Sequence, residues 1–167
     1  MLIDLSELLL HKRKDQCFDA DIEMEYFELS GSKYKITRHN PLKLIISFMD
    51  NNKIYLETKI DVSLIMPCDR CLDDVEVNIQ TNISKEIDMT ESEESDIFED
   101  KLFNVEKFVY KEILIELPMK VLCSESCKGI CNRCGTNLNR KTCDCDTTQL
   151  DPRMAKVLDV FKDFKEV

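Results

Sequence analysis

The chain has 167 residues, 43% of them hydrophobic and 34% charged, a composition that supports one compact domain with a small appendage and argues against intrinsic disorder. No apolar run is long enough for a membrane helix and acidic residues interrupt the first apolar stretch, so we expect neither a membrane span nor a secretory signal. The formal net charge of −10 disfavours a protein that coats nucleic acid with its whole surface.

Short apolar and polar patterns predict strands in the first part of the chain. Residues 2–10 are typical of a strand followed by a short helix, and 21–29 and 42–49 of two further strands. Asp50-Asn51-Asn52 is a turn sequence, and we expect it to lead the chain from 42–49 into the next strand.

The most regular pattern in the chain predicts a long hairpin. Apolar residues share one parity from Ile54 to Met66 and again from Val75 to Ile83, as expected for two strands that each bury one face. Cys68 and Cys71 lie between the two strands. We therefore expect a CxxC turn at the tip of this hairpin.

An acidic segment and two predicted helices follow the hairpin. Residues 86–100 hold eight acidic and no basic residues, and because like charges that close repel one another, we expect a solvated loop with a mobile middle. Helical spacing predicts a helix that starts near Val105 and ends before Pro118. Asp151-Pro152 is typical of a helix start, with Asp as the N-cap and Pro in the first turn.

Together these elements predict an α+β fold. We expect an antiparallel β-sheet, barrel-like in one version, with two or three helices and a cysteine-rich, zinc-binding C-terminal module. Residues 1–117 would form the β domain with its helix and acidic loop. Residues 118–167 would form the zinc-binding module and the C-terminal helix, packed on the first domain.

Eight of the nine cysteines form four close pairs. Without an export signal we expect a cytoplasmic, reducing location, where clustered thiols indicate metal or redox chemistry instead of disulfides. Zinc takes four thiolates at tetrahedral corners, and a short turn with two cysteines supplies two of them. Four pairs therefore predict two structural zinc ions, with Cys17 left over. The pairs are Cys68 and Cys71, Cys123 and Cys127, Cys131 and Cys134, and Cys143 and Cys145.

Two partitions of these pairs are open. The preferred one joins the last two pairs on one ion and the hairpin CxxC with Cys123 and Cys127 on the other, which would fasten the C-terminal module to the sheet. The competing one groups the four consecutive cysteines from Cys123 to Cys134 and leaves the hairpin CxxC to Cys143 and Cys145. The spacing is compatible with both.

The sequence favours a binding protein over an enzyme. The two histidines, His11 and His39, are not near a cysteine pair, and we find no Gly-rich phosphate loop, Ser/His/Asp arrangement or HExxH motif. We expect no catalytic residue, no small-molecule substrate and no membrane partner. The alternative is a thiol redox sensor or oxidoreductase that uses the CxxC pairs.

A local basic segment lies within this acidic chain. Residues 128–141 contain four basic and no acidic residues, and cationic side chains attract phosphate, so contact with RNA is one interpretation. The other is that they offset the −2 charge that four thiolates give to a bound zinc ion. Asn132, Asn137 and Asn139 add hydrogen-bond donors to the segment. The four basic residues are Lys128, Arg133, Arg140 and Lys141.

The cysteine turns and their flanking residues resemble a known family. They are similar to the bacterial YceD family, the large ribosomal RNA subunit accumulation proteins, in its cysteine-rich Gram-positive form. The motifs are Cys68-Asp69-Arg70-Cys71-Leu72, Leu117-Pro118, Leu122-Cys123, Cys127-Lys128-Gly129-Ile130-Cys131, Cys134-Gly135-Thr136-Asn137-Leu138-Asn139, Cys143-Asp144-Cys145 and Asp151-Pro152-Arg153.

The resemblance implies a cytoplasmic factor that supports accumulation or processing of 23S ribosomal RNA and biogenesis of the large ribosomal subunit. It implies no catalytic residue, and it marks the eight paired cysteines as metal ligands. The expected partner is ribosomal RNA or a basic ribosomal protein of the large subunit. A basic protein would suit residues 1–117, where acidic residues outnumber basic ones by 12.

Overall fold

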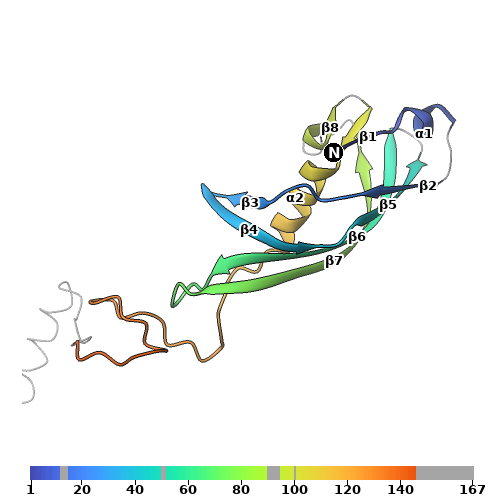
Figure 1. Ribbon diagram of the computed structural model, residues 1–167. Helices are drawn as coiled ribbons and strands as arrows, with labels where there is room; N and C mark the ends of the chain where they lie inside the picture. Colours follow the sequence, from blue (N-terminus) through green and yellow to red (C-terminus); the bar gives the residue numbers. More distant parts are fainter. Residues whose placement is uncertain (12–14, 50–51, 90–94, 100, 146–167) are drawn as a thin grey trace, which may run out of the picture. The chain divides into compact units, whose positions relative to one another are not determined.

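A computed structural model describes residues 1–11, 15–49, 52–89, 95–99 and 101–145 (Figure 1). The predicted helix at Asp151 lies outside these residues. The helices are α1 (Ser6–His11) and α2 (Val105–Glu116), with a 3-10 turn at Ser95–Ile97. The strands are β1 (Leu2–Asp4), β2 (Gln16–Ala20), β3 (Tyr26–Leu29), β4 (Ser32–His39), β5 (Leu42–Met49), β6 (Lys53–Pro67), β7 (Asp74–Asp88), β8 (Phe98–Glu99) and β9 (Leu102–Asn104).

The chain divides into two compact units. The first comprises Met1–Cys68 and Asp73–Val121, and the second comprises Asp69–Leu72 and Leu122–Val167. All the helices and strands named above lie in the first unit. The tip of the β6–β7 hairpin, Asp69–Leu72, is part of the second unit.

The main sheet of the first unit is antiparallel and open. Its strand order is β2-β5-β6-β4-β3, and β7 pairs along the other edge of β6 (Figure 1). β6 and β7 pair without interruption from Lys53 opposite Asp88 to Pro67 opposite Asp74, which confirms the predicted hairpin. No pairing among the described strands closes the sheet on itself, so the barrel-like version of the prediction is wrong. A smaller sheet has the order β1-β9-β8.

The buried face of the main sheet follows the predicted alternation. Ile54, Leu56, Ile60, Val62 and Leu64 of β6 are fully buried. α2 adds its own apolar side chains to the same hydrophobic cluster. A register shift of one residue would turn the β6 side chains to solvent, so burial of this face fixes the strand pairing.

α2 begins and ends as the sequence predicts. Asn104 caps its first turn, since the side-chain oxygen accepts a hydrogen bond from the backbone N–H of Lys107 at 3.2 Å. At the other end Leu117 is extended, with φ −58° and ψ 130°, because the following proline disfavours helical backbone there. Glu112, buried on α2, forms an ion pair with Lys85 of β7, which compensates the buried charge.

Several segments differ from prediction. β2 and β4 were not predicted. β2 is only five residues long, and in β4 Ile36 is the one buried residue, so the burial of β4 gives no alternating pattern. Of the predicted strand 21–29, Tyr26–Leu29 alone is a strand. The predicted acidic loop 86–100 begins inside β7 and ends in the 3-10 turn and β8, where Ile97 and Phe98 are buried in the core. Its middle, 90–94, lies outside the described residues.

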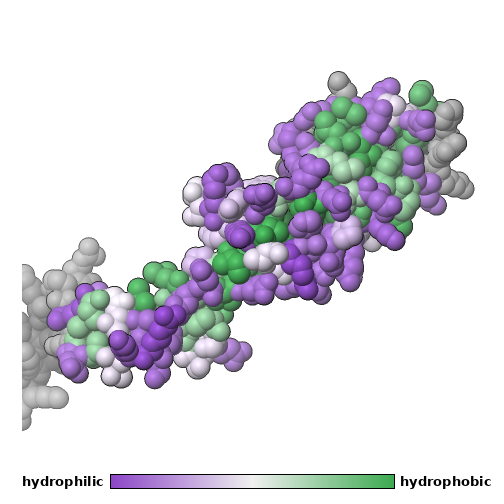
Figure 2. Space-filling model, viewed as in Figure 1, coloured by the Kyte–Doolittle hydropathy of each residue, from purple (hydrophilic) through white to green (hydrophobic). Residues whose placement is uncertain are grey.

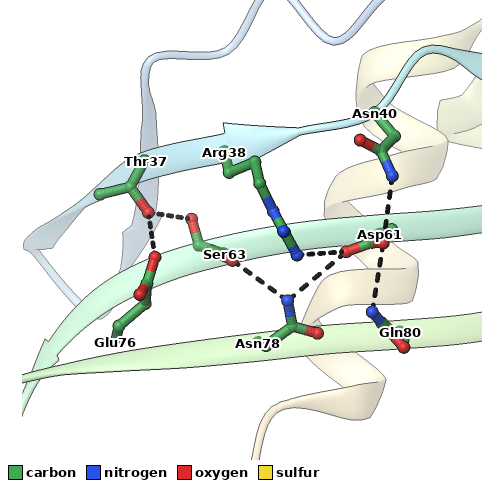
Figure 3. Close-up of polar contacts among 8 residues, drawn as sticks. All are labelled: Thr37, Arg38, Asn40, Asp61, Ser63, Glu76, Asn78 and Gln80. Atoms are coloured by element: carbon green, nitrogen blue, oxygen red, sulfur yellow. Dashed lines mark hydrogen bonds and ion pairs between the residues drawn. The ribbon is translucent and has the colours of Figure 1, made fainter.

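The solvent face of the main sheet carries a connected polar network (Figure 3). Asp61 of β6 is at its centre. One carboxylate oxygen accepts from Arg38 Nη2 at 3.3 Å and Asn78 Nδ2 at 3.5 Å, and the other from Asn40 Nδ2 at 3.1 Å and Gln80 Nε2 at 3.2 Å. Four donors therefore hold this carboxylate and tie β4, β6 and β7 together through side chains.

The face of the described residues that Figure 2 shows is largely polar. Hydrophilic residues cover most of it, and hydrophobic residues gather in smaller patches. Among the residues that the structure describes, we find no helix with the length and apolarity needed to cross a membrane.

Candidate metal centres

The second unit has no apolar core in the part that the structure describes. Within 69–72 and 122–145, the buried side chains are those of three cysteines, Cys71, Cys127 and Cys131. Short backbone contacts shape this region, including a β-bridge between Ile130 and Asn137. A segment that buries so little hydrocarbon needs another source of stability, and bound metal is a common one.

The first cysteine cluster contains Cys68, Cys71, Cys123 and Cys127. Their four sulfur atoms all lie within 4.8 Å of one another, and the sulfurs of Cys71 and Cys123 are 3.5 Å apart. The hairpin turn positions the first two, since the backbone N–H of Cys68 donates to the carbonyl of Asp73 at 2.8 Å.

The second cluster contains Cys131, Cys134, Cys143 and Cys145, whose sulfurs also lie within 4.8 Å of one another. The CxxC turn is closed by the N–H of Gly135, which donates to the carbonyl of Cys131 at 2.9 Å. Gly135 has φ +70°, a left-handed conformation that glycine adopts without steric cost. The eight sulfurs thus group in the two sets of the preferred partition, and the competing partition does not occur.

Both clusters fit a tetrahedral metal ion. Sulfurs about 2.3 Å from a zinc ion at tetrahedral corners lie about 3.8 Å from one another. Because all four sulfurs of each cluster lie within 4.8 Å of one another, they need at most a small contraction to reach that geometry. If four thiolates filled all four corners, each cluster would have the closed composition of structural metal sites and would leave no position for a reacting water.

The thiols of the second cluster differ in acidity when no metal is bound. The hydroxyl and the backbone N–H of Thr136 lower the pKa of Cys134 to about 6. Backbone N–H groups of Cys134 and Arg133 lower the pKa of Cys131. A hydrogen bond to the readily ionised Cys134 favours the protonated form of Cys145 and raises its pKa to about 12. Thiolates that lie close together repel one another, and this repulsion keeps the last thiols of the cluster protonated. A bound cation would relieve it.

In metal-free chains that have not yet unfolded, we expect Cys134 to be alkylated much faster than Cys145, so the labelling pulse must be short compared with unfolding of the second unit. With its pKa lowered to about 6, Cys134 is mostly thiolate at neutral pH and loses reactivity only as the pH falls below that value. Cys145, with its pKa raised to about 12, stays protonated throughout. Iodoacetamide labelling read by peptide mass spectrometry measures both rates, and equal rates at neutral pH would contradict this assignment.

The same experiment on the metal-loaded protein tests the redox alternative. Bound metal should protect all eight paired cysteines. Rapid labelling of Cys68 or Cys71 in the loaded protein would favour a thiol redox function instead.

Two residues that the sequence analysis did not assign to the metal sites support the first cluster. Arg70 lies in the hairpin CxxC, and its Nη1 donates to the carbonyl of Cys127 at 2.9 Å. The Nδ2 of Asn139 donates to the sulfur of Cys127 at 3.2 Å, which lowers the pKa of that thiol. Within the second unit, the carboxamide of Asn139 donates to Cys127 and accepts from the backbone N–H of Lys128.

Gly129 allows the turn that carries Cys127 to approach the tip of the hairpin closely. It has φ +78°, and a Cβ added there would lie 3.0 Å from the carbonyl oxygen of Arg70. Gly135, with φ +70°, has no atom within 4 Å of the same added position. Arg70 also accepts from the N–H of Ile130 at 3.0 Å, so this contact is part of the turn that carries Cys127.

We expect Gly129→Ala to weaken the second unit more than Gly135→Ala does. Both variants strain a left-handed residue by about 1–2 kcal/mol, but Gly129→Ala also displaces the Arg70 carbonyl. The chelator concentration at which 122–145 becomes sensitive to protease should therefore fall further for Gly129→Ala. Equal shifts in the two variants would show that the contact with Arg70 contributes nothing.

The four predicted basic residues are exposed, and all lie in the second unit. Lys128 lies between the two clusters in the sequence, Arg133 in the second CxxC turn, and Arg140 and Lys141 in the loop before Cys143. Cys17, predicted as a leftover thiol, is exposed and belongs to neither cluster. His39 is also exposed and outside both clusters.

Comparisons with known proteins point to one family. The family model described as Large ribosomal RNA subunit accumulation protein YceD matches residues 56–162. A Bacillus subtilis protein, Uncharacterized protein YlbN, is 27% identical over 161 residues, which cover 92% of this chain and 93% of that protein. The chloroplastic Large ribosomal RNA subunit accumulation protein YCED homolog 1 of Arabidopsis thaliana is 33% identical over 51 residues, 30% of this chain and 16% of that protein. No solved structure matches the chain.

Proposed function

The chain belongs to the YceD family, and from this premise we propose that it is a cytoplasmic, non-enzymatic, zinc-stabilised factor that supports accumulation or processing of 23S ribosomal RNA. The family description supports the ribosomal role. One observation carries the zinc part: eight cysteine sulfurs form two sets of four, each within 4.8 Å. Large-subunit biogenesis is then the process in which the protein acts.

The proposed role of the zinc ions is structural. Each would be held by one of the two sets of four cysteines defined above. Bound zinc would cross-link distant parts of the second unit, in place of the hydrocarbon core that its described residues lack. Four protein ligands per ion support a binding role over a catalytic one.

We propose that the second unit contacts ribosomal RNA. Residues 69–72 and 122–145 carry five basic and three acidic side chains, and the exposed cations lie on the turns between the cysteines. Phosphate groups pair with such cations. The acidic excess of 12 over residues 1–117 suits a basic ribosomal protein instead, which charge complementarity would steer to that part of the chain.

Crosslinking in cells, with RNA and protein partners identified together, tests this proposal. A variant in which Lys128, Arg133, Arg140 and Lys141 are replaced by Gln should lose its crosslinks to ribosomal RNA. A matched control, with the same charge change, replaces four exposed lysines of the first unit and should keep them. The control lysines are Lys35, Lys43, Lys59 and Lys101.

Purified protein distinguishes phosphate contact from charge balance. If the four cations bind the phosphates of single-stranded RNA, log affinity should depend less steeply on log salt in the variant. The magnitude of the slope should decrease by about 0.7 for each cation that the substitutions remove. If they only offset the thiolates, the Gln variant should bind zinc more weakly and bind RNA unchanged. Unchanged large-subunit RNA after depletion of the protein would contradict the function itself.

A further inference from the structure

Asn139 lies in the loop of the second cysteine cluster, but its side chain contacts the first cluster. It lies in the loop between Cys134 and Cys143, which are both members of the second cluster. Its Nδ2, however, is 3.2 Å from the sulfur of Cys127, a member of the first cluster. The side chain therefore connects the loop of one cluster with a ligand atom of the other.

The orientation of the Asn139 amide is fixed by a second hydrogen bond. The backbone N–H of Lys128 donates to Oδ1 of Asn139 at 2.7 Å. A backbone N–H can only donate, so the oxygen of the carboxamide must face Lys128 and the NH₂ group must face the sulfur. A donor directed at a thiolate stabilises the charged form that binds a metal.

The backbone holds the Asn139 loop against the segment that carries Cys127. The N–H of Leu138 donates to the carbonyl of Gly129 at 2.8 Å, and Asn137 forms the β-bridge with Ile130. The N–H of Asn139 donates to the side chain of Asn137 at 2.9 Å. The position of the amide therefore depends on the conformation of the whole loop.

We propose that Asn139 couples the two clusters, so that metal bound at the second raises the metal affinity of the first. This inference rests on the proposed zinc sites. Cysteines of the second cluster lie on both sides of the Asn139 loop, and coordination of all four would fix the two ends of that loop. The amide is then held in place before the first cluster binds its ion. By thermodynamic linkage, metal at the first cluster strengthens the second by the same factor.

Asn139 is a positioning residue in this scheme and not a ligand. Loss of a residue that hydrogen-bonds a metal ligand typically costs roughly 10–100-fold in metal affinity. We expect Asn139→Ala to weaken zinc binding at the first cluster by a factor in that range. Asn139→Asp, which keeps the acceptor for Lys128 and loses the donor to sulfur, should weaken it at least as much.

A thermodynamic cycle on the full chain tests the coupling. Proteins are equilibrated at buffered free zinc and briefly alkylated, and peptide mass spectrometry gives the zinc concentration that half-protects Cys71 and Cys123. The four proteins are the wild type, Asn139→Ala, Cys143→Ser with Cys145→Ser, and the combination. Asn132→Ala, which removes an exposed carboxamide from the second CxxC turn, is the control and should leave this midpoint unchanged.

The proposal predicts strong non-additivity. The two serine substitutions should raise the midpoint of the first cluster roughly 10–100-fold in the wild type and by no more than about twofold in the Asn139→Ala background. An equal rise in both backgrounds, or no rise in either, would overturn the coupling and leave the zinc sites standing. Absence of zinc protection at both clusters would overturn the zinc sites and the coupling together.

Discussion

Removal of metal is expected to unfold the second unit while the sheet of the first unit stays folded. Among the described residues, the continuous apolar cluster lies entirely in the first unit, whereas the buried side chains of the second unit are those of cysteines. Zinc contributes about 10–16 kcal/mol to the folding of small zinc-finger peptides at neutral pH. Whole domains are stable by only about 5–15 kcal/mol. The second unit should therefore not survive the loss of its ions.

Hydrogen exchange with and without a strong chelator measures this effect. The amides of 122–145 should lose protection when zinc is removed and regain it when zinc is restored. The paired amides of β6 and β7 are the internal control, because their hydrogen bonds and buried side chains do not involve metal. Protection of 122–145 that is the same with and without the chelator would contradict the structural role of zinc.

Loss of the first cluster is expected to abolish function in cells. Cys71→Ser together with Cys127→Ser removes two of four ligands, and uncoordinated thiols cannot hold the turns that carry the basic side chains. In a strain that lacks its own copy, this variant should lower the ratio of large-subunit to small-subunit ribosomal RNA as far as complete absence of the protein does.

Cys17→Ser is the matched control for that experiment. Cys17 is exposed on β2 and belongs to neither cluster, so its substitution should restore the normal RNA ratio. Protein levels of both variants must be compared by immunoblot. If the double variant is present at the wild-type level and still restores the ratio, the first cluster is dispensable and the scaffold account is wrong.

The sequence predicted the parts of the fold where burial repeats with a fixed period. In β6 every second side chain is buried from Ile54 to Met66, so the alternation of residue types directly reports the strand. Leu117 is extended for a local reason, the proline that follows it. β4 could not be predicted in this way, because backbone pairing with β3 and β6 holds it and its side chains are mostly exposed.

The composition of the two cysteine clusters could be predicted from the sequence, but the way the pairs combine could not. Short spacing reveals the four cysteine pairs, because two thiolates on one turn reach the same ion. Which pairs share an ion depends on contacts between residues far apart in the sequence, such as Cys71 and Cys123. The role of Asn139 has the same origin, since only the folded loop brings its amide to Cys127. Polar residues placed between cysteines are the signal that marks such candidates for inspection.

The metal content of the purified chain tests the central claim most directly. Native mass spectrometry of protein prepared without oxygen or chelator should show two zinc ions per chain, with all eight paired cysteines resistant to alkylation until the zinc is removed. A chain without bound metal, or one whose paired cysteines have formed disulfides, would contradict the account.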